Sequence, residues 1–413
     1  MKQQYVLAYD LGHTRNKAAL FDEDLRKVSA AFSPYGTCCR FPKVMEQDPH
    51  EWWRSVRKTT QQLLDKTCID SAEIACLTFS GQVMGRVPVT RDAESLRSAI
   101  IWADQRVAKG ATYIQRAIAL KRFYALTGYR PSVSYSAGKV LWIKENQSGS
   151  FERTHKFLQT KDFSIARITG AFVADCSDAS GTNLFEWDAL RWSDQIRQAA
   201  DLSDRKLAQP VESTRVVGYL LHTAADELGL VRGEGSCAAA GAGVISERRG
   251  YHYLGSSSWI GAATPEPIID DAMPTLNWVH VIAGMFAATG TMRAAGASYQ
   301  WFKGVPYYFD LQNNATYAEM DALADTNPPC SYGLPFLPYL PGGEKSPLES
   351  SGFRGIRGPS DRIWSGPYDS GCRGGDGIKR ARSILSVSAA RVWIWGRPCL
   401  PVVAARAALG LKF

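Results

Sequence analysis

The sequence predicts an α/β protein with two domains. Its 413 residues exceed the size at which a single hydrophobic core usually stops growing. Short apolar runs typical of strands alternate with longer segments in which apolar residues recur at helical spacing. The first three apolar runs are joined by short turns, so we expect an antiparallel meander that leads into the first helix.

The meander covers the beginning of the chain. Its predicted strands are residues 4–11 (QYVLAYDL), 17–24 (KAALFDED) and 27–35 (KVSAAFSPY). A helix should follow, because Asp48 is a suitable N-cap and Pro49 stands at the first helical position. Its buried stripe is expected to contain Trp52, Val56, Leu63 and Leu64.

Later segments continue the alternation. Strands are predicted at 74–82 (IACLTFSGQ) and 98–104 (SAIIWAD), and a helix is predicted from 106 to Gly128. Further along, one helix should end at Gly229, and a helix of small residues should start near Ser236. Three strands, a helix, a strand and more helix is the order of the nucleotide-binding fold shared by sugar kinases, actin and heat-shock ATPases. We therefore expect the actin-like (ribonuclease H-like) ATPase fold; two such domains with an interdomain cleft are what the family resemblance given below implies.

The net charge of +8 is concentrated in the last part of the sequence. From Pro347 onward, nine Arg and two Lys stand against four acidic residues, and Gly, Ser, Pro and Arg replace the amphipathic periods. A basic nucleic-acid-binding arm would explain the charge, but such arms usually lack the Trp and Ile-Trp pairs present here. We expect no nucleic-acid partner.

Other features of the composition predict a soluble, cytoplasmic protein. No apolar run is as long as a membrane span, and the first ten residues are too short and too quickly interrupted for a signal peptide. The nine cysteines form no CxxC pair and no Cys/His cluster, so neither a zinc site nor a disulfide framework is indicated. We expect reduced thiols and no membrane contact.

The turn of the first hairpin, within YDLGHTRNK (9–17), has the residues of a phosphate site. Gly12 allows a phosphate oxygen to approach the backbone closely, and Lys17 adds positive charge. Asp10, at the end of the first strand, can hold Mg²⁺ through its water shell. By itself the motif is explained better by an ordinary hairpin with a surface lysine.

The sequence resembles the FGGY family of carbohydrate kinases and, within it, the xylulokinase branch. The matching stretches occur in the family's order and cover roughly residues 1 to 347. They are YDLGHTRNKAALFDED, FSGQVMG, AIIWADQR, SYSAGKVLWIKEN, FLQTKDFSIARITGAFVADCSDASGTNLFEW, YLGSSSWIGA, ATGTMRAAGASYQWF and LPFLPYLPGGEKSP.

The resemblance implies transfer of the γ-phosphoryl of ATP, with Mg²⁺, to a sugar hydroxyl. Asp10 would hold the metal. The implied sugar contacts are Gln82, Val83, Met84, Trp102, Asp104 and Arg106. The implied nucleotide contacts are Gly12, His13, Thr14, Lys17, Gly255, Ser256, Ser257 and Gly290. The alternatives are a buried strand end for Val83, an Asp–Arg pair beside a core Trp for residues 102–106, and plain small-residue turns for the glycines.

Three departures from the family pattern stand beside these matches. His13 and Arg15 replace small residues, and we expect Arg15 to strain a turn that favours glycine. Relative to the family pattern, the catalytic Asp and its strand are missing, as after a deletion; Glu234 is the one carboxylate near the expected place and the candidate replacement base, with an exposed loop residue as the alternative. The resemblance also stops near Pro347, as after a shift of reading frame, so the second domain is expected to be incomplete.

The predicted domains are therefore 1–246 (sugar-binding, first phosphate turn), 247–346 (partial nucleotide-binding) and 347–413 (an atypical basic tail). Two function classes stay open at this point. One is an ATP-dependent kinase of a small sugar, with D-xylulose first and gluconate, ribulose, fuculose or glycerol as related substrates. The other is an inactive relic or sugar-binding pseudokinase. A homodimer is compatible with either.

Overall fold

The computed structural model describes residues 4–40, 44–231, 236–238, 250–254, 258–269, 275–292, 336–337, 355–357 and 363–364. The chain divides into two compact units, Met1–Glu247 with Ala263–Ala288 and Arg248–Ala262 with Thr289–Phe413. The domain boundaries after residues 246 and 346 remain predictions.

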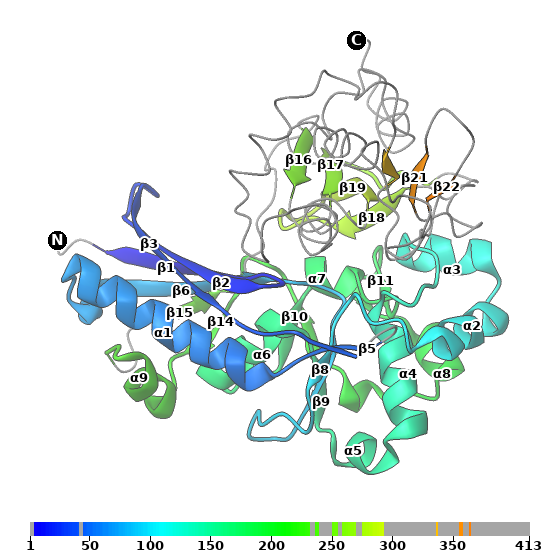
Figure 1. Cartoon of the computed structure of the whole chain (residues 1–413), viewed down its shortest axis with the longest axis horizontal. Helices are drawn as coiled ribbons and strands as arrows, with labels where there is room; N and C mark the ends of the chain where they lie inside the picture. Colours follow the sequence, from blue (N-terminus) through cyan, green and yellow to red (C-terminus); the bar gives the residue numbers. More distant parts are fainter. Residues whose placement is uncertain are drawn as a thin grey trace, which may run out of the picture. The chain divides into compact units, whose positions relative to one another are not determined.

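A six-stranded sheet with the order β14-β15-β6-β1-β2-β3 is the centre of the first unit (Figure 1). The strands are β1 (Tyr5–Leu11), β2 (Arg15–Phe21), β3 (Lys27–Pro34), β6 (Ile74–Gly81), β14 (Val216–Tyr219) and β15 (Ser236–Ala238). The first three are antiparallel neighbours, so the predicted meander is confirmed. β6 runs parallel to β1, and Leu11 lies opposite Gly81. The turn after β1 and the loop after β6 therefore leave the sheet at the same edge.

The first helix, α1 (Pro49–Thr67), begins as predicted, with the Asp48 side chain accepting from the amide of His50. It packs on β2 and β3, while α6 (Thr160–Thr169) packs on β6, and both contact α9 (His222–Leu228). Trp52, Val56 and Leu63 are buried, and Leu64 is partly buried. The predicted stripe holds α1 to the sheet because it removes these apolar side chains from water.

The prediction of one continuous helix from 106 to 128 is wrong. It is two helices, α2 (Ala108–Ala117) and α3 (Leu120–Thr127), separated at Ile118, whose backbone is extended. A straight helix would carry Lys121 and Arg122 on the face that Ile114 buries, since they lie seven and eight positions further on. The break changes the phase so that apolar residues of α3 enter the core.

Gly128 ends α3 as predicted, with φ of 73° in the left-handed region. A Cβ at this position would lie only 2.9 Å from the Cβ and carbonyl oxygen of Asn277. Glycine is required here both by the backbone conformation and by this close approach.

Two further predictions need correction. Of the strand predicted at 98–104, only β8 (Ala99–Ile100) is present, because the chain turns where the Asp104 amide donates to the Ile101 carbonyl. Residues Ser236–Ala238 form the strand β15 and not the start of a helix. β15 pairs parallel with β6 and antiparallel with β14. It thereby satisfies backbone groups of β6 that would otherwise be unpaired, which a helix could not do.

The other described elements are shorter. The helices are η1 (Ser71–Glu73), α4 (Ser136–Asn146), α5 (Ser148–Arg153), α7 (Cys176–Ser180), α8 (Asp194–Ala199) and η2 (Asp204–Lys206). The small sheets are β4 (Cys38–Arg40) with β5 (Val44–Gln47) and β8, β7 (Val87–Val89) with β9 (Lys156–Leu158), β10 (Val173–Asp175) with β13 (Gln209–Val211), and β11 (Phe185–Glu186) with β12 (Arg191–Trp192). A four-stranded sheet has the order β16 (Gly250–Leu254), β17 (Ser258–Thr264), β19 (Phe286–Met292), β18 (Leu276–Val279), and a three-stranded sheet contains β20 (Phe336–Leu337), β21 (Gly355–Arg357) and β22 (Ile363–Trp364). Among the described helices, none has the length and apolar composition of a membrane span.

Candidate active site

The turn between β1 and β2 is closed by its own backbone. The Gly12 amide donates to the Arg15 carbonyl at 3.1 Å, and a Cβ at Gly12 would meet this oxygen at 3.3 Å. The amide of Gly12 is therefore used within the hairpin. Arg15 is the first residue of β2, does not have a positive φ, and places its guanidinium over the Phe32 ring at 5.7 Å. The expectation that Arg15 strains the turn is wrong.

The carbonyl groups of residues 12–14 in this turn all accept hydrogen bonds from other parts of the protein. The Gly12 carbonyl accepts from the Tyr35 hydroxyl, and the Thr14 carbonyl accepts from the Tyr35 amide at 3.2 Å. The His13 carbonyl accepts from Gln47 Nε2 at 2.6 Å. Within the described residues, the amides of His13 and Thr14 donate to no other group. A turn whose carbonyls face inward and whose amides are free is suited to bind an anion.

The His13 side chain joins this turn to the sugar-side candidates. Its ring meets the Trp102 ring edge-on, with 5.2 Å between the centroids. Burial lowers the pKa of His13 to about 4, against the raising effect of Asp10. The imidazole is therefore neutral near pH 7, so it contributes no positive charge to phosphate binding.

Asp10 and Lys17 face each other across the hairpin. Lys17 Nζ lies 3.3 Å from Asp10 Oδ2, and both side chains are about half exposed. A single solvated carboxylate suits Mg²⁺, which keeps most of its water shell and is usually held by one or two carboxylates together with phosphate. Asp10 lies near the end of β1, two residues before Gly12, and its charge acts on the His13 imidazole, so its position fits that role.

The loop after β6 carries the next candidates. The Gln82 amide donates to the Leu11 carbonyl at 2.8 Å, and the Met84 amide donates to Gln159 Oε1 at 2.6 Å. Met84 has a φ of 68°, an unusual value for a residue with a side chain. Val83 is partly buried. These bonds hold the loop next to the phosphate turn.

Asp104 and Arg106 form an ion pair with each other. Arg106 Nη2 lies 2.6 Å from Asp104 Oδ2 and 2.8 Å from Glu46 Oε1, while the Met45 amide donates to Asp104 Oδ2 at 2.7 Å. Asp104 is fully buried, and Arg106 lies 4.8 Å from the Trp142 ring. The Asp–Arg alternative describes this geometry, and direct contact of the pair with a sugar remains a prediction.

A buried ion cluster adjoins the end of β6. Lys161 Nζ lies 2.7 Å from Asp162 Oδ1 and 3.1 Å from Asp178 Oδ2, and it also pairs with Asp175. The position of a Cβ at Gly81 is 3.6 Å from the Lys161 Cβ. Within the described residues, these aspartates are the one acidic group compact enough for a metal ion. Because Lys161 already pairs with all three, we assign the cluster a structural role.

The electrostatics of the cluster agree with that role. Burial opposes the charge of Lys161, but the three aspartates hold its pKa well above the ordinary value. Arg86 is also fully buried, and burial lowers its pKa to about 10 against the raising effects of Asp162 and Asp178. Gln159 connects the cluster to the loop after β6. Its Nε2 donates to the Asp178 carbonyl at 3.0 Å, and its Oε1 accepts from the Met84 amide.

The variant Asp178→Asn is expected to change how stability depends on pH. Burial, opposed by Lys161 and reinforced by Asp175 and Asp162, raises the pKa of Asp178 to about 7. Because the folded pKa exceeds the unfolded one, this group's stabilisation is complete below about pH 4 and is lost as the pH rises through about 7. Relative to the variant, the wild type should lose at least about 1 kcal/mol between pH 5 and pH 8. Urea unfolding at both pH values measures this, and a constant difference between the two proteins would contradict it.

The sequence pattern did not indicate Gln47, Tyr35 or the charged cluster as site residues. The signal for the cluster was present as charges inside otherwise apolar stretches, such as LQTKDFSIA. Glu234, Gly255, Ser256 and Ser257 lie outside the described residues, so their roles remain predictions. Gly290 lies in β19 and is partly exposed.

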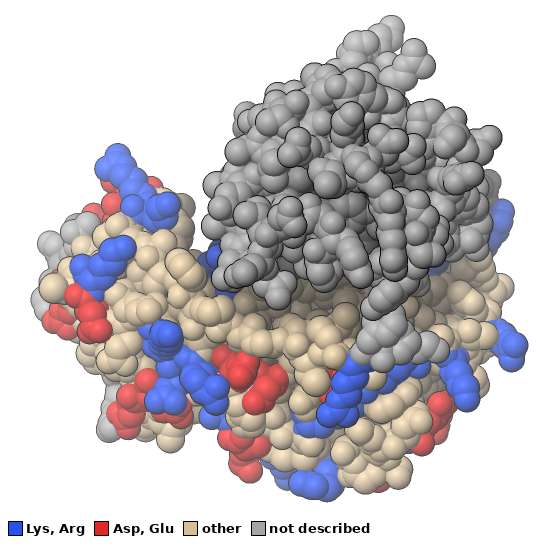
Figure 2. All heavy atoms as spheres, viewed as in Figure 1, with Lys and Arg blue, Asp and Glu red and all other residues tan. Residues whose placement is uncertain are grey.

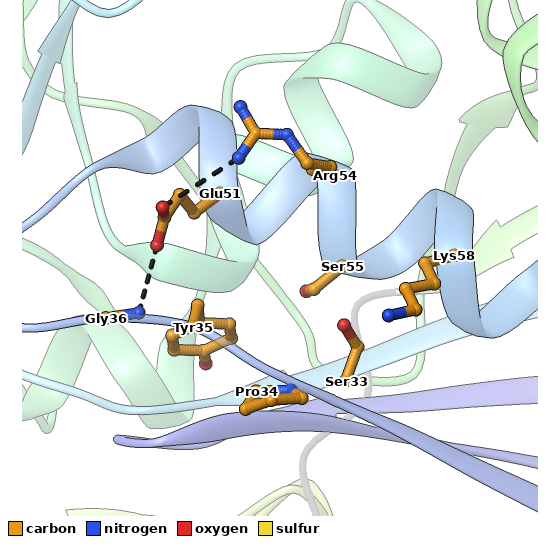
Figure 3. Close-up of a pocket in the computed structure, with 8 residues that line it drawn as sticks. All are labelled: Ser33, Pro34, Tyr35, Gly36, Glu51, Arg54, Ser55 and Lys58. Atoms are coloured by element: carbon orange, nitrogen blue, oxygen red, sulfur yellow. Dashed lines mark hydrogen bonds and ion pairs between the residues drawn. The ribbon is translucent and has the colours of Figure 1, made fainter.

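A pocket of about 420 Å³ lies between the end of β3 and α1 (Figure 3). Polar contacts occur within its lining, since Glu51 Oε2 accepts from the Gly36 amide at 2.9 Å and Glu51 Oε1 lies 3.8 Å from Arg54 Nη1. The lining residues are Ser33, Pro34, Tyr35, Gly36, Glu51, Arg54, Ser55 and Lys58. None of the predicted site residues lines this pocket. Of its lining residues, Tyr35 also contacts the phosphate turn, through its bonds to the Gly12 and Thr14 carbonyls.

The sheet, with β1 antiparallel to β2 and parallel to β6, has the strand arrangement of the actin-like fold. Solved structures confirm that fold. A xylulose kinase from Lactobacillus acidophilus matches with a TM-score of 0.74 and 21% identity over 92% of this chain and 75% of that one. A gluconate kinase from the same organism matches with a TM-score of 0.75 and 22% identity over 93% and 75% of the two chains.

Sequence comparison gives the family. Residues 5–242 match the N-terminal domain of the FGGY family of carbohydrate kinases, and the chain belongs to that family. It is 28% identical to the xylulose kinase of Lactococcus lactis over 365 residues, which are 85% of this chain and 70% of that protein. It is 27% identical to the xylulose kinase of Bacillus subtilis over 360 residues, 85% and 71% of the two chains.

Proposed function

We propose that this FGGY-family protein transfers the γ-phosphoryl of ATP to a hydroxyl of a small sugar, with D-xylulose as the first candidate. The observation that carries the proposal is the turn at residues 12–14: its carbonyls accept bonds from the protein, the amides of His13 and Thr14 donate to no group among the described residues, and the His13 ring meets Trp102. Phosphate and sugar groups would thus lie side by side. The names of the similar proteins support D-xylulose ahead of other sugars.

The residues have the following proposed roles. The amides of His13 and Thr14 bind phosphate oxygens, and Lys17 contributes positive charge. Asp10 holds Mg²⁺, which would neutralise phosphate charge when bound. Gln82 and Trp102 orient the sugar. Its hydroxyl oxygen bonds to the γ-phosphorus, the bond from phosphorus to the ADP oxygen breaks, and the hydroxyl proton passes to a carboxylate, for which Glu234 is the candidate.

The surface agrees with a small-molecule substrate. On the face shown in Figure 2, Lys and Arg side chains lie interspersed with Asp and Glu over the described residues.

We propose that residues 1–246 provide the sugar side and the first phosphate turn, and that residues 247–346 provide the second nucleotide side.

A coupled assay of ADP formation from ATP and D-xylulose tests the proposal. Turnover that requires both substrates is the expected result. Sugar binding by the folded protein without any turnover would instead support a non-catalytic sugar-binding protein.

The variant Glu234→Gln tests the assignment of the base. Losing a general base should lower kcat by about 100-fold with little change in KM. The same substitution at the exposed Glu266 is the control and should leave kcat unchanged. Equal kcat values for Glu234→Gln and wild type would remove Glu234 from the mechanism and leave the kinase activity in place.

A further inference from the structure

Gln47 joins the phosphate turn to the sugar-side residue Gln82 through direct hydrogen bonds. It is the last residue of β5 and is almost completely buried. Its Nε2 donates to the His13 carbonyl at 2.6 Å and to Thr37 Oγ1 at 2.8 Å. Its Oε1 accepts from Trp52 Nε1 at 3.0 Å and from Gln82 Nε2 at 2.6 Å. Gln47 is thus fully bonded at both ends of its amide.

The chemistry of the end groups sets the direction of every bond in this chain. An indole N–H can only donate and a backbone carbonyl can only accept. The oxygen of Gln47 must therefore face Trp52, and its nitrogen must face His13. Because that oxygen is an acceptor, Gln82 has to turn its own nitrogen toward Gln47. These neighbours therefore decide between the two possible orientations of the Gln82 amide, because only the one with Nε2 toward Gln47 makes the hydrogen bond.

The remaining atom of Gln82 has a defined character. Its Oε1 is buried and accepts from no donor within the described part of the chain. A buried acceptor without a donor is costly, so a ligand that supplies one gains affinity there. A hydroxyl can donate to it, whereas a carboxylate would be repelled.

We propose that Gln47 is a positioning residue that makes Gln82 present its carbonyl oxygen to a hydroxyl of the substrate. The inference rests on the proposed sugar kinase function and deepens it. The place next to Gln82 Oε1 would then take a hydroxyl of a neutral polyol or ketose and would exclude an acid group. Through the His13 carbonyl, the same residue also holds the phosphate turn.

The test is calorimetric titration of D-xylulose into the full chain without ATP. Gln47→Met removes the acceptor that orients Gln82, so the Kd should rise about three- to tenfold, the effect of one neutral hydrogen bond. Gln82→Met should also weaken binding. The double variant should bind the sugar no more weakly than Gln82→Met, because in the absence of ATP the proposed effect of Gln47 on sugar binding passes through Gln82. Losses that add in the double variant, or an unchanged Kd for Gln47→Met, would overturn the inference.

Two further variants separate positioning from general loss of structure. Trp53→Phe is the matched control for the loss of a buried indole hydrogen bond of α1. The Trp53 indole donates to Glu227 Oε2 at 2.7 Å and takes no part in the hydrogen bonds of Gln47. It should leave the Kd unchanged. In Gln47→Glu the carboxyl group keeps an acceptor oxygen for Trp52 and Gln82, and its protonated form donates to the His13 carbonyl, so the Kd should rise less than in Gln47→Met. If Gln47→Glu binds as weakly as Gln47→Met, or if Gln47→Met does not fold and Gln47→Glu binds weakly, Gln47 is structural only.

The result also distinguishes this inference from the proposed function. A wild-type protein that binds no D-xylulose contradicts both. A wild-type protein that binds the sugar, with no coupling between positions 47 and 82, contradicts the inference and leaves the kinase proposal standing.

Discussion

Replacing Lys161 with methionine is expected to lower the free energy of unfolding by about 3–5 kcal/mol. The Lys161 ammonium pairs with Asp162, Asp175 and Asp178, and all four side chains are buried. Methionine has a similar length but no charge, so the three carboxylates would be left with Arg86 as the nearby cation. A buried charge that loses its partner keeps its desolvation cost, which is why the effect is large. Urea unfolding followed by tryptophan fluorescence measures it.

The matched control for this variant is Lys144→Met. Lys144 Nζ lies 2.7 Å from Asp201 Oδ2, but the Asp201 side chain is almost fully exposed. Water solvates Asp201 after the lysine is removed, so the loss should be much smaller. The double variant Lys161→Met with Asp175→Asn should recover part of the stability, because, against the raising effect of burial, Lys161 lowers the pKa of Asp175 and this carboxylate is charged when it loses its partner. Similar losses for Lys161→Met and Lys144→Met would contradict a stabilising role of the buried cluster.

The second large effect is expected on activity. Asp10→Asn should lower kcat by about 1000-fold, at the upper end of what one preorganised charge-stabilising group contributes. Asparagine has nearly the same shape but cannot hold Mg²⁺ as a carboxylate does. The exposed ion pair with Lys17 contributes little to stability, so the melting temperature should hardly change. Steady-state kinetics with varied ATP and Mg²⁺ provide the measurement.

Asp22→Asn is the matched control for Asp10→Asn. Asp22 stands in the turn between β2 and β3, where its Oδ1 accepts from the amides of Asp24 at 3.0 Å and Arg26 at 2.8 Å. The substitution can weaken this turn but should leave kcat close to that of the wild type. Asp10 would lose its proposed role if both variants had the same kcat.

The elements with strong local signals were predictable. The meander and α1 follow from apolar alternation, from the cap at Asp48 and from Pro49, all of which act within a few residues. The break at Ile118 was not, because it depends on keeping Lys121 and Arg122 out of a core that other segments build. The strand at Ser236–Ala238 was missed for a similar reason. Three small residues carry little intrinsic preference, and the unpaired edge of β6 decides their conformation.

The candidate site shows the same division. Motifs placed Asp10, Gly12 and Gln82 at or just after the ends of two predicted strands, and the structure pairs these strands in parallel, which brings the residues to one edge of the sheet. The Gly12 amide closes the hairpin, and the amides of His13 and Thr14 donate to no group in the part of the chain that the structure describes. Which backbone groups are free depends on Tyr35 and Gln47, and no pattern within the turn indicates these two partners.

By itself, the sequence determined the α/β class, the order of the first strands and helix, and membership of the FGGY family. These depend on local periodicity and on motifs in a fixed order, which are properties of the chain read in one dimension. Only the tertiary structure decided the direction of the Gln82 amide, the pairing of Lys161 and the neutral state of His13. Gln47 and Gln82 are separated by 35 positions, yet their amides touch. The direction of a hydrogen bond and the state of a buried charge are set by neighbours in space, which the fold must first bring together.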